Sequence, residues 1–276
     1  MVTDAHYTFE ELMLRRTSIM NVIVEAPGIK TFWLAGAIPA APGQFVMLWI
    51  PEVGARPFSV YRVTNDSFAL TIASVGYFTQ ALFNLPCGSP LGYFGPFGRP
   101  FVSRGKHPAL VGGGYGAAPL LFLAQRHAQT WCRIEFIVGS RTASLLLYRD
   151  EPSILGRLVR HDCTDDGSFG YCGSAAERLR LLLLEDPTID MVYTVGPERM
   201  MAAVVDVCER ASVDYQISLE RYMKCGYGLC GACCVDPIGI RICVEGPVLD
   251  RETVRSISEF GVYHRDETGT KIHFEP

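Results

Sequence analysis

The chain has 276 residues, of which 49% are hydrophobic and 20% charged, with a formal net charge of −4 at pH 7. This composition is typical of a globular protein, and the length suits two domains. The slight negative charge gives no electrostatic reason to expect nucleic acid or an anionic membrane as partner. The N-terminus lacks the pattern of a signal peptide, and no apolar run approaches about 18 residues, so we expect a cytoplasmic protein.

The first part of the chain has the pattern of β-structure. From residue 17 to residue 101, short extended runs are broken by Pro and Gly. Strands of this length with such frequent turn signals indicate an antiparallel barrel or sandwich. We therefore predict a β-barrel domain at residues 16–105. It follows an N-terminal extension, residues 1–15, whose pattern allows no more than a short helix.

Beyond Lys106, buried strands alternate with helical stretches. The predicted helices cover 119–129, 143–151, 175–185 and 197–211. The predicted strands cover 109–114, 132–140, 157–163, 190–196 and 214–220. Such alternation predicts an α/β domain with a parallel sheet, which we place at residues 106–218. Residues 219–276 form a Gly- and Cys-rich tail that is too short and irregular to fold without a metal.

Five of the ten cysteines fall within residues 225–243 of this tail. The predicted ligands are Cys225, Cys230, Cys233 and Cys243. Their C-x4-C-x2-C spacing with a distant fourth cysteine is the plant-type 2Fe–2S pattern. Residues 242–248 resemble a strand that delivers the fourth ligand. A structural zinc site is the alternative, and Cys234 is an alternative ligand to Cys233.

Two segments of the predicted barrel have the residue types of a flavin site. Arg56 lies beside a strand with Ser59 two residues beyond Pro57, so the pair can clamp a pyrophosphate and hydrogen-bond a flavin edge. Gly76 and Thr79 would offer backbone and hydroxyl donors at the start of a short helix. The alternative is an ordinary strand followed by an ordinary turn.

The predicted α/β domain has candidate nucleotide-binding residues at its strand ends. The glycines of the first loop are Gly112, Gly113, Gly114 and Gly116. They follow a strand and open a helix, so the backbone can approach a phosphate, although the G-x-G-x-x-G fingerprint is absent. Arg141 and Asp165 follow the next two strands, where ligands gather. Arg141 can hold a phosphate, which leaves NAD and NADP open, whereas Asp165 either receives ribose hydroxyls or belongs to a solvated turn.

Six motifs occur in the order seen in the ferredoxin-reductase family. They are GQF at 43–45, RPFS at 56–59, G-x-x-T at 76–79, GPFGRPF at 95–101, VGGGYGAAPL at 111–120 and VGPERMM at 195–201. With the cysteine motif added, the chain closely resembles the electron-transfer subunits of NAD-linked (class 1B) dihydroorotate dehydrogenases over residues 16–250. The resemblance implies a barrel that binds FAD, an α/β domain that binds the nicotinamide nucleotide, and a cluster that faces a catalytic FMN subunit. It also implies a heterotetramer of two plus two subunits.

The resemblance assigns roles to single positions. The flavin-binding strand is assigned to Arg56, Pro57, Phe58 and Ser59, the pyrophosphate turn to Gly76 and Thr79, and backbone contacts along the flavin to Thr71, Ile72 and Ala73. Gly196 and Glu198 fall near the nicotinamide, where Glu198 has a capping role as its alternative. The family commonly reads G-x-G-T at the turn. Phe78 replaces the second Gly, so either the turn differs or the ring covers the cofactor.

The implied activity passes electrons from a partner FMN dihydroorotate dehydrogenase subunit through 2Fe–2S and FAD to NAD, in pyrimidine biosynthesis. No catalytic side chain is expected, because cofactors carry this chemistry. One alternative is a diaphorase subunit of a hydrogenase or of a ferredoxin:NAD(P) oxidoreductase complex. Another is a redox sensor or a zinc-stabilised binding module without catalytic activity.

Overall fold

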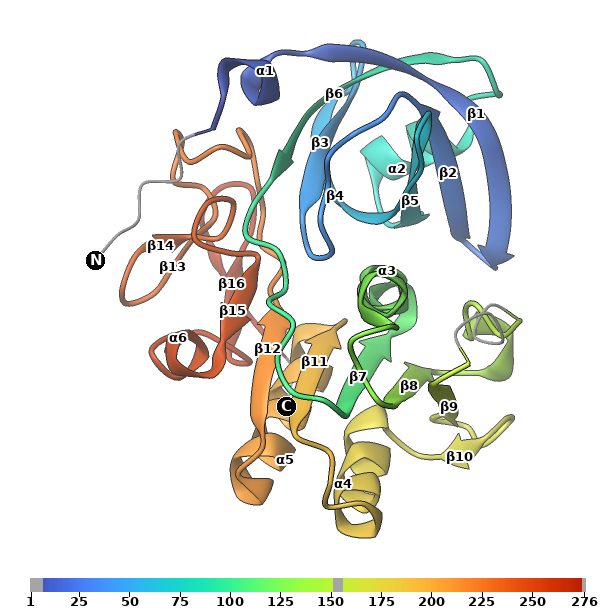
Figure 1. Ribbon diagram of the computed structural model, residues 1–276. Coiled ribbons are helices and arrows are strands. Elements are labelled where there is room, and N and C mark those ends of the chain that lie inside the picture. The colour runs from blue at the N-terminus through green and yellow to red at the C-terminus, as the bar shows by residue number, and fades with distance from the viewer. Residues whose placement is uncertain (1–6, 151–155, 275–276) are drawn as a thin grey trace.

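Two stacked layers dominate the computed structural model, which describes residues 7–150 and 156–274 (Figure 1). An antiparallel barrel lies above an α/β sheet, and the cysteine-rich tail runs along one side of both. This arrangement confirms the predicted fold class. A short helix, α1 (Phe9–Leu12), precedes the barrel. Thr8 and Glu11 cap it reciprocally, each accepting a backbone N–H from the other.

Six antiparallel strands close the barrel in the order β1-β2-β5-β4-β3-β6. They are β1 (Arg15–Ala26), β2 (Ile29–Ala35), β3 (Phe45–Ile50), β4 (Gly54–Val63), β5 (Ser67–Ala73) and β6 (Pro90–Phe97). Closure leaves no strand edge exposed. Inward-facing apolar side chains such as Phe32, Leu48 and Leu70 fill the interior. Helix α2 (Tyr77–Phe83) connects β5 to β6.

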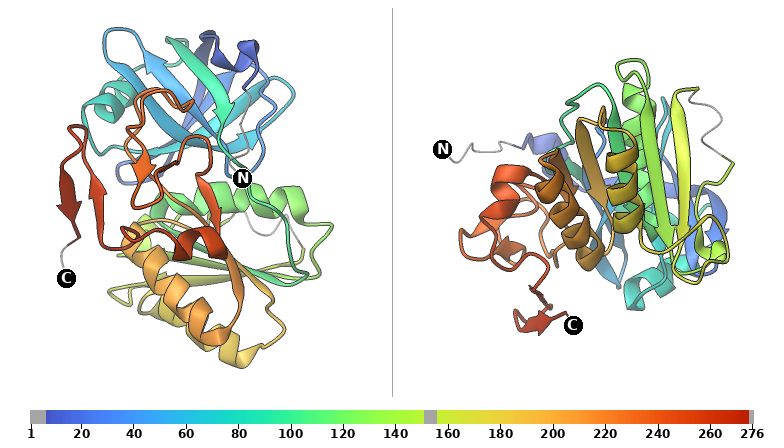
Figure 2. Two further views of the ribbon diagram at one scale, coloured as in Figure 1. Left: turned by 90° about the vertical axis from the view of Figure 1, so that its left-hand side faces the viewer. Right: turned by 90° about the horizontal axis from the view of Figure 1, so that it is seen from below.

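The α/β layer is a seven-stranded sheet in the order β10-β9-β8-β7-β11-β12-β15. Its strands are β7 (Pro108–Gly113), β8 (Ile134–Ser140), β9 (Leu158–Thr164), β10 (Tyr171–Cys172), β11 (Met191–Val195), β12 (Asp214–Ser218) and β15 (Val248–Asp250). A 3-10 turn, η1 (Gly114–Gly116), leads from β7 into α3 (Ala117–His127), which lies between sheet and barrel. Helices α4 (Ala175–Glu185) and α5 (Glu198–Ala211) cover the opposite face (Figure 2).

The helix predicted at 143–151 is wrong over the part that the structure describes. The chain forms only a 3-10 turn, η2 (Ala143–Leu145), and then extends. Tyr148, which has a left-handed backbone with a φ of +56°, is buried; its hydroxyl lies 2.5 Å from that of Thr71 and its ring stacks on Tyr61 of the barrel. Arg160 donates to the carbonyls of Leu147 and Tyr148. These contacts with the barrel and with β9 outweigh the helix propensity of the segment.

The tail contains short elements and one strand of the large sheet. They are β13 (Cys234–Val235), β14 (Ile240–Arg241), β15, α6 (Arg251–Arg255), β16 (Tyr263–Arg265) and β17 (Lys271–His273). β15 pairs antiparallel with β12. The strand predicted at 242–248 is wrong, because Cys243 lies in a turn between β14 and β15. Ile242 donates its N–H to the Cys233 carbonyl, which holds this turn against the cysteine-rich loop.

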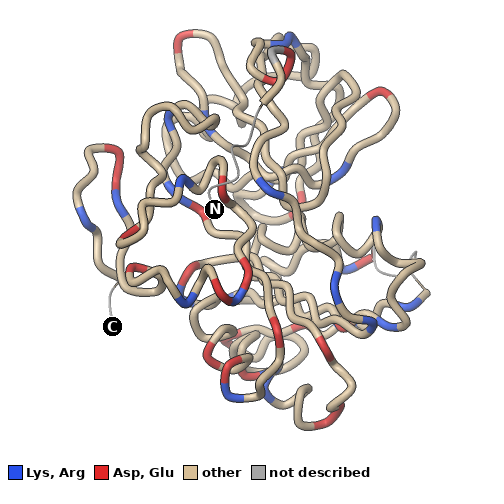
Figure 3. Tube along the Cα trace, turned by 60° about the vertical axis from the view of Figure 1, so that its left-hand side comes forward, with Lys and Arg blue, Asp and Glu red and all other residues tan. Residues whose placement is uncertain are grey.

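Acidic and basic residues are interspersed along the described chain (Figure 3). No helix in the described part of the chain is long and apolar enough to cross a membrane.

Candidate functional site

A cleft of about 560 Å³ lies where the barrel, the α/β layer and the tail meet. The last residues of β11 and β12, Val195 and Ser218, line it, so the carboxyl ends of the parallel strands face the barrel. This edge is where open α/β sheets bind ligands. All nine residues that the resemblance assigns to the flavin line the cleft, namely Arg56, Pro57, Phe58, Ser59, Thr71, Ile72, Ala73, Gly76 and Thr79.

Arg56 stands on the barrel wall of the cleft without an acidic partner in the part of the chain that the structure describes. Its Nη1 donates to the Ala55 carbonyl at 2.8 Å, and its guanidinium lies over the Tyr222 ring, 5.5 Å from the centroid. A guanidinium with free donors is suited to a phosphate or pyrophosphate. Two apolar side chains at the same cleft, Val75 and Tyr77, are 79% and 76% exposed. These features fit a bound flavin dinucleotide.

The Thr79 hydroxyl builds the turn at the end of β5. It accepts the N–H groups of Val75 and Gly76 at 2.9 and 3.0 Å and donates to the Gly76 carbonyl at 2.9 Å. Thr79 therefore shapes the turn with the hydroxyl that the sequence assigned to a cofactor. The Phe78 ring is buried in the barrel core, 5.7 Å from the Phe58 ring, so the turn accommodates the aromatic side chain by folding it inward.

Of the four glycines predicted to approach a phosphate, only Gly116 lines the cleft. A Cβ on Gly116 would lie 2.3 Å from the Val195 carbonyl oxygen, and one on Gly112 would lie 2.8 Å from the Ala117 Cα. Gly113 faces Met200 and Pro197 at similarly short range. Close packing therefore already requires glycine at these three positions. Gly114 has a φ of +53° with open space around it, so its requirement is a left-handed backbone.

The cleft wall formed by the tail was not predicted from the sequence. Beyond β12 the chain carries Glu220, Arg221 and Tyr222 past the cleft. The Tyr115 hydroxyl donates to Glu220 Oε2 at 3.3 Å, and this carboxylate raises the pKa of Tyr115 above its usual range. The only signal in the sequence is that these residues follow the carboxyl end of a parallel strand.

The remaining predicted nucleotide ligands lie outside the cleft lining. Arg141 and Asp165 are exposed and lie together at the carboxyl edge of the sheet, because Asp165 donates its N–H to the Ser140 carbonyl at the end of β8. Gly196 directly follows β11, in the bend that leads to α5. Glu198 opens α5, but its carboxylate is bound by the Arg221 guanidinium at 2.6 and 3.1 Å.

The four predicted cluster ligands form two thiol pairs. The thiol of Cys230 influences the pKa of Cys225, and the thiol of Cys243 influences that of Cys233. Cys243 also donates its backbone N–H to Cys233 Sγ at 3.4 Å. No three sulfur atoms of the described cysteines lie within 4.8 Å of one another. Cys233 and Cys243 are buried, whereas Cys230 is exposed. Cys234 belongs to neither pair and lies on β13 opposite Arg241.

Backbone donors surround these sulfurs. Burial raises the pKa of Cys225, but N–H groups of Cys230 and Tyr227 lower it, and the result lies below the usual thiol value. A hydrogen bond from the Cys243 side chain lowers the pKa of Cys233 to about 7. Cys225 and Cys233, which have a lowered pKa, are suited to ligate a metal cluster, whereas the Cys243 thiol that donates to Cys233 has its pKa raised by that hydrogen bond and by burial. The loop therefore fits an iron–sulfur group.

Tyr7 connects the N-terminal segment to this site. Its hydroxyl donates to the Cys243 carbonyl at 2.8 Å and accepts the Gly98 N–H at 3.2 Å, and its ring packs edge-on against Phe97. Burial raises the pKa of Tyr7 to about 12, so it stays a neutral donor. The sequence offered no signal for this contact.

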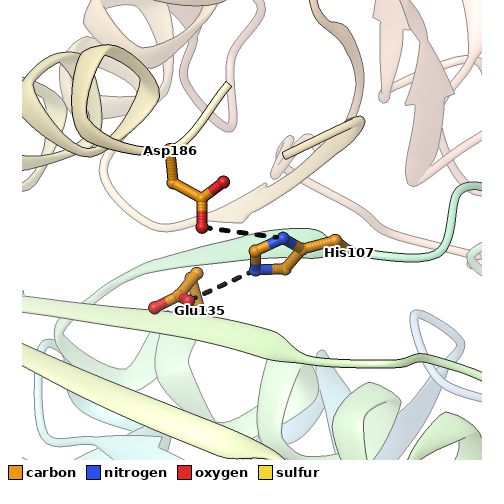
Figure 4. A group of neighbouring side chains, drawn as sticks. All are labelled: His107, Glu135 and Asp186. Carbon is orange, nitrogen blue, oxygen red and sulfur yellow. Dashed lines mark hydrogen bonds and ion pairs between the residues drawn. The ribbon is translucent and has the colours of Figure 1, made fainter. Parts of the chain in front are cut away.

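A cluster of three titratable side chains, His107, Glu135 and Asp186, lies at the opposite edge of the sheet from the cleft (Figure 4). Glu135 is fully buried and binds His107 Nε2 at 3.2 Å and His161 Nε2 at 2.6 Å. Arg133 Nε lies 2.5 Å from the same carboxylate. Because the Arg133 guanidinium also lies 3.9 Å from Asp186 and so neutralises both carboxylates, we read the group as an internal ion network.

Comparison with known proteins agrees with this geometry. The model of the iron–sulfur cluster binding domain of dihydroorotate dehydrogenase B matches residues 220–255, which contain both thiol pairs. A Methanocaldococcus jannaschii protein, described as the probable electron transfer subunit of dihydroorotate dehydrogenase B (NAD(+)), is 40% identical over 93% of this chain and 97% of its own length. The chain belongs to the family of dihydroorotate dehydrogenase B electron transfer subunits. Another family member, from Pyrococcus furiosus, is 36% identical over 93% of this chain and 98% of its own length.

Solved structures place this family member in a wider fold group. The structure of an NADH-dependent reduced ferredoxin-NADP oxidoreductase, studied for flavin-based electron bifurcation, superimposes with a TM-score of 0.77 at 27% identity, covering 88% of this chain and 93% of that chain. The ferredoxin reductase of carbazole 1,9a-dioxygenase gives 0.63 at 23% identity, covering 73% of this chain and 66% of that one, which shows the fold alone.

Proposed function

We propose that this chain carries electrons from a catalytic FMN subunit that oxidises dihydroorotate, through a 2Fe–2S cluster and FAD, to NAD+ in pyrimidine biosynthesis. The family membership and the cleft beside the thiol pairs support this assignment. When bound, the cluster supplies one-electron exchange and the flavin supplies both one- and two-electron exchange, which hydride transfer to a nicotinamide requires. The cytoplasmic location and the two-plus-two stoichiometry stay predictions.

The spacing of the sulfurs is the observation that favours 2Fe–2S over zinc. A tetrahedral zinc site draws four sulfurs to one centre at about 2.3 Å, so all four would lie close together. Here the sulfurs are two separate pairs, which suits two metal ions with two thiolates each. We assign Cys225 with Cys230 to one iron and Cys233 with Cys243 to the other.

The pair that contains the exposed Cys230 is the proposed entry point for electrons from the partner. Cys230 is exposed, and its neighbour Leu229 is 77% exposed, whereas Cys233 and Cys243 are buried toward the barrel. A cluster held this way has one end at the surface and the other directed into the protein. Electrons from a catalytic subunit would enter at Cys225 and Cys230.

The cleft residues have distinct proposed roles. Arg56 binds the flavin pyrophosphate, and the half-buried strand around Ser59 hydrogen-bonds the flavin edge. Glu220, which accepts a hydrogen bond from Tyr115 and lines the same cleft, is our candidate to contact the nicotinamide. Arg141 and Asp165 stay our candidates for the far end of the nucleotide, with NAD and NADP both open at Arg141.

The test is co-expression of the chain with a candidate FMN partner under anaerobic purification. We expect a brown-yellow complex with two irons and two acid-labile sulfides per chain, and NADH formation that depends on dihydroorotate. A colourless protein that contains zinc would refute the cluster assignment. A coloured complex without NADH formation from dihydroorotate would refute the substrate assignment.

A second candidate is a subunit of a ferredoxin:NAD(P) oxidoreductase complex, which the fold similarity to the NADH-dependent reduced ferredoxin-NADP oxidoreductase favours. The co-purifying partner separates the two candidates. An FMN enzyme that reduces the chain with dihydroorotate supports the first, and an iron–sulfur subunit that exchanges electrons with ferredoxin supports the second.

A further inference from the structure

Arg221 is the centre of a buried ion network beside the cleft. Its side chain is 3% exposed, and its Nη1 and Nη2 bind the two oxygens of Glu198 at 2.6 and 3.1 Å. Its Nε binds Glu259 Oε1 at 2.8 Å. Glu259 is fully buried, and the Glu198 side chain is 8% exposed. Such a network adds little net stability over apolar packing, but it defines one arrangement of its parts.

The two carboxylates extend the network into separate segments. Glu198 opens α5 of the α/β layer and also accepts the Gly261 N–H at 2.9 Å. Glu259 uses its second oxygen to accept the Asp236 N–H at 2.9 Å. Asp236 lies three residues beyond the cluster ligand Cys233. One guanidinium therefore fixes the α/β layer, the C-terminal segment and the cluster loop relative to one another.

The neighbours of Arg221 in the chain explain why this position matters. Glu220 and Tyr222, on either side of it, line the cleft, and Tyr222 lies under the Arg56 guanidinium. Cys225, the first cluster ligand, follows four residues later. A single short stretch thus joins the flavin cleft to the cluster, and Arg221 anchors its middle.

We propose that Arg221 is a positioning residue that sets the separation and orientation of the flavin cleft and the iron–sulfur cluster, and with them the rate of electron passage between the two. The inference rests on the proposed function. Each passage moves one electron with no bond made or broken, and two passages accompany each hydride exchanged with NAD. Arg221 acts through Glu220, Tyr222 and Cys225, because its own donors are occupied by Glu198 and Glu259.

The test mixes the holo-chain with NADH under anaerobic conditions and follows two signals. Flavin bleaching reports the hydride step, and the electron paramagnetic resonance signal of the reduced cluster, after freeze-quenching, reports the electron step. Arg221→Lys keeps the charge but loses the planar fork. Glu259→Gln keeps the shape but sets an amide donor against Arg221 or Asp236. Arg210→Met, which removes a 78% exposed arginine of α5, is the matched control.

We expect the ratio of cluster reduction to flavin bleaching to fall about tenfold in Arg221→Lys and severalfold in Glu259→Gln, because small misplacements of reacting centres have effects of this size. The control should keep the parent ratio. An unchanged ratio in both variants, with iron content and cluster line shape intact, would overturn the inference. If Arg221→Lys loses its cluster, the ratio of cluster reduction to flavin bleaching in Glu259→Gln decides whether the inference holds. If NADH does not bleach the flavin of the parent chain, the proposed function is refuted, and this inference with it.

Discussion

Replacing Glu135 by Gln tests whether the buried network at the far sheet edge stabilises the fold. The carboxylate is fully buried and contacts His107, His161 and Arg133. Breaking a buried ionic group by removing one partner costs about 3–5 kcal/mol. Because Gln keeps the volume and one acceptor oxygen, we expect the lower end, about 3 kcal/mol of unfolding free energy. For a chain of this size that corresponds to a melting temperature lower by about 6–12 °C at pH 7.

The pH dependence of this loss gives a second check. Burial alone would raise the pKa of Glu135, but hydrogen bonds from His161 and His107 lower it below the ordinary 4.5. A lowered folded-state pKa means that the added stability is fully present above pH 4.5 and is lost as the pH falls through the folded-state pKa. The difference between parent and Glu135→Gln should therefore be largest near neutral pH and shrink below pH 4.5.

Thermal unfolding followed by circular dichroism measures both effects. Glu185→Gln is the matched control, because Glu185 pairs with Arg178 on the same side of the sheet but is 56% exposed. Its loss should cost under about 1 kcal/mol. The reasoning fails if Glu135→Gln melts within about 2 °C of Glu185→Gln at pH 7, or if the gap between them widens in acid.

Three further experiments have defined outcomes. Cys234→Ser should keep the parent iron and sulfide content, whereas Cys230→Ser should lose most of it, by colorimetric analysis; equal losses would contradict the ligand assignment. Arg56→Met should weaken FAD binding, measured by fluorescence titration, about tenfold to a hundredfold, which is the size of one charge-assisted hydrogen bond. Arg180→Met, which replaces an exposed arginine, is the control and should leave the titration unchanged. Ser212 ends α5 with a φ of +58°, so Ser212→Gly should raise the unfolding free energy by about 1 kcal/mol, and a lower melting temperature would refute this.

The sequence predicts the fold well where a pattern is local. Short extended runs between turn residues, and the alternation of strands with helices, identify the barrel and the parallel sheet, because each pattern depends only on neighbouring residues. The helix at 143–151 fails because Leu147 and Tyr148 are buried by contacts with distant strands. The strand at 242–248 fails because Cys243 is held in a turn by the N-terminal Tyr7 and the cysteine-rich loop.

The residues of the candidate site can likewise be predicted from the sequence only where they carry a local motif. Cys225, Cys230 and the strand around Arg56 carry recognisable spacing or motifs. Glu220 and Arg221 do not, since their roles arise from partners such as Tyr115 and Glu198 that lie far away in the sequence. The glycines at 112–116 show a further limit, because tight packing and phosphate binding demand the same residue and the sequence cannot separate the two demands.

The placement of β15 has a consequence for engineering. This strand forms the outer edge of the large sheet, with Leu249 opposite Ile217 of β12, although it lies beyond the last cluster cysteine in the chain. The cluster loop therefore connects two neighbouring strands of the same sheet, β12 before it and β15 after it. Grafting it onto another reductase would require transplanting both flanking strands, and truncating the chain before β15 would leave the β12 edge open to aggregation.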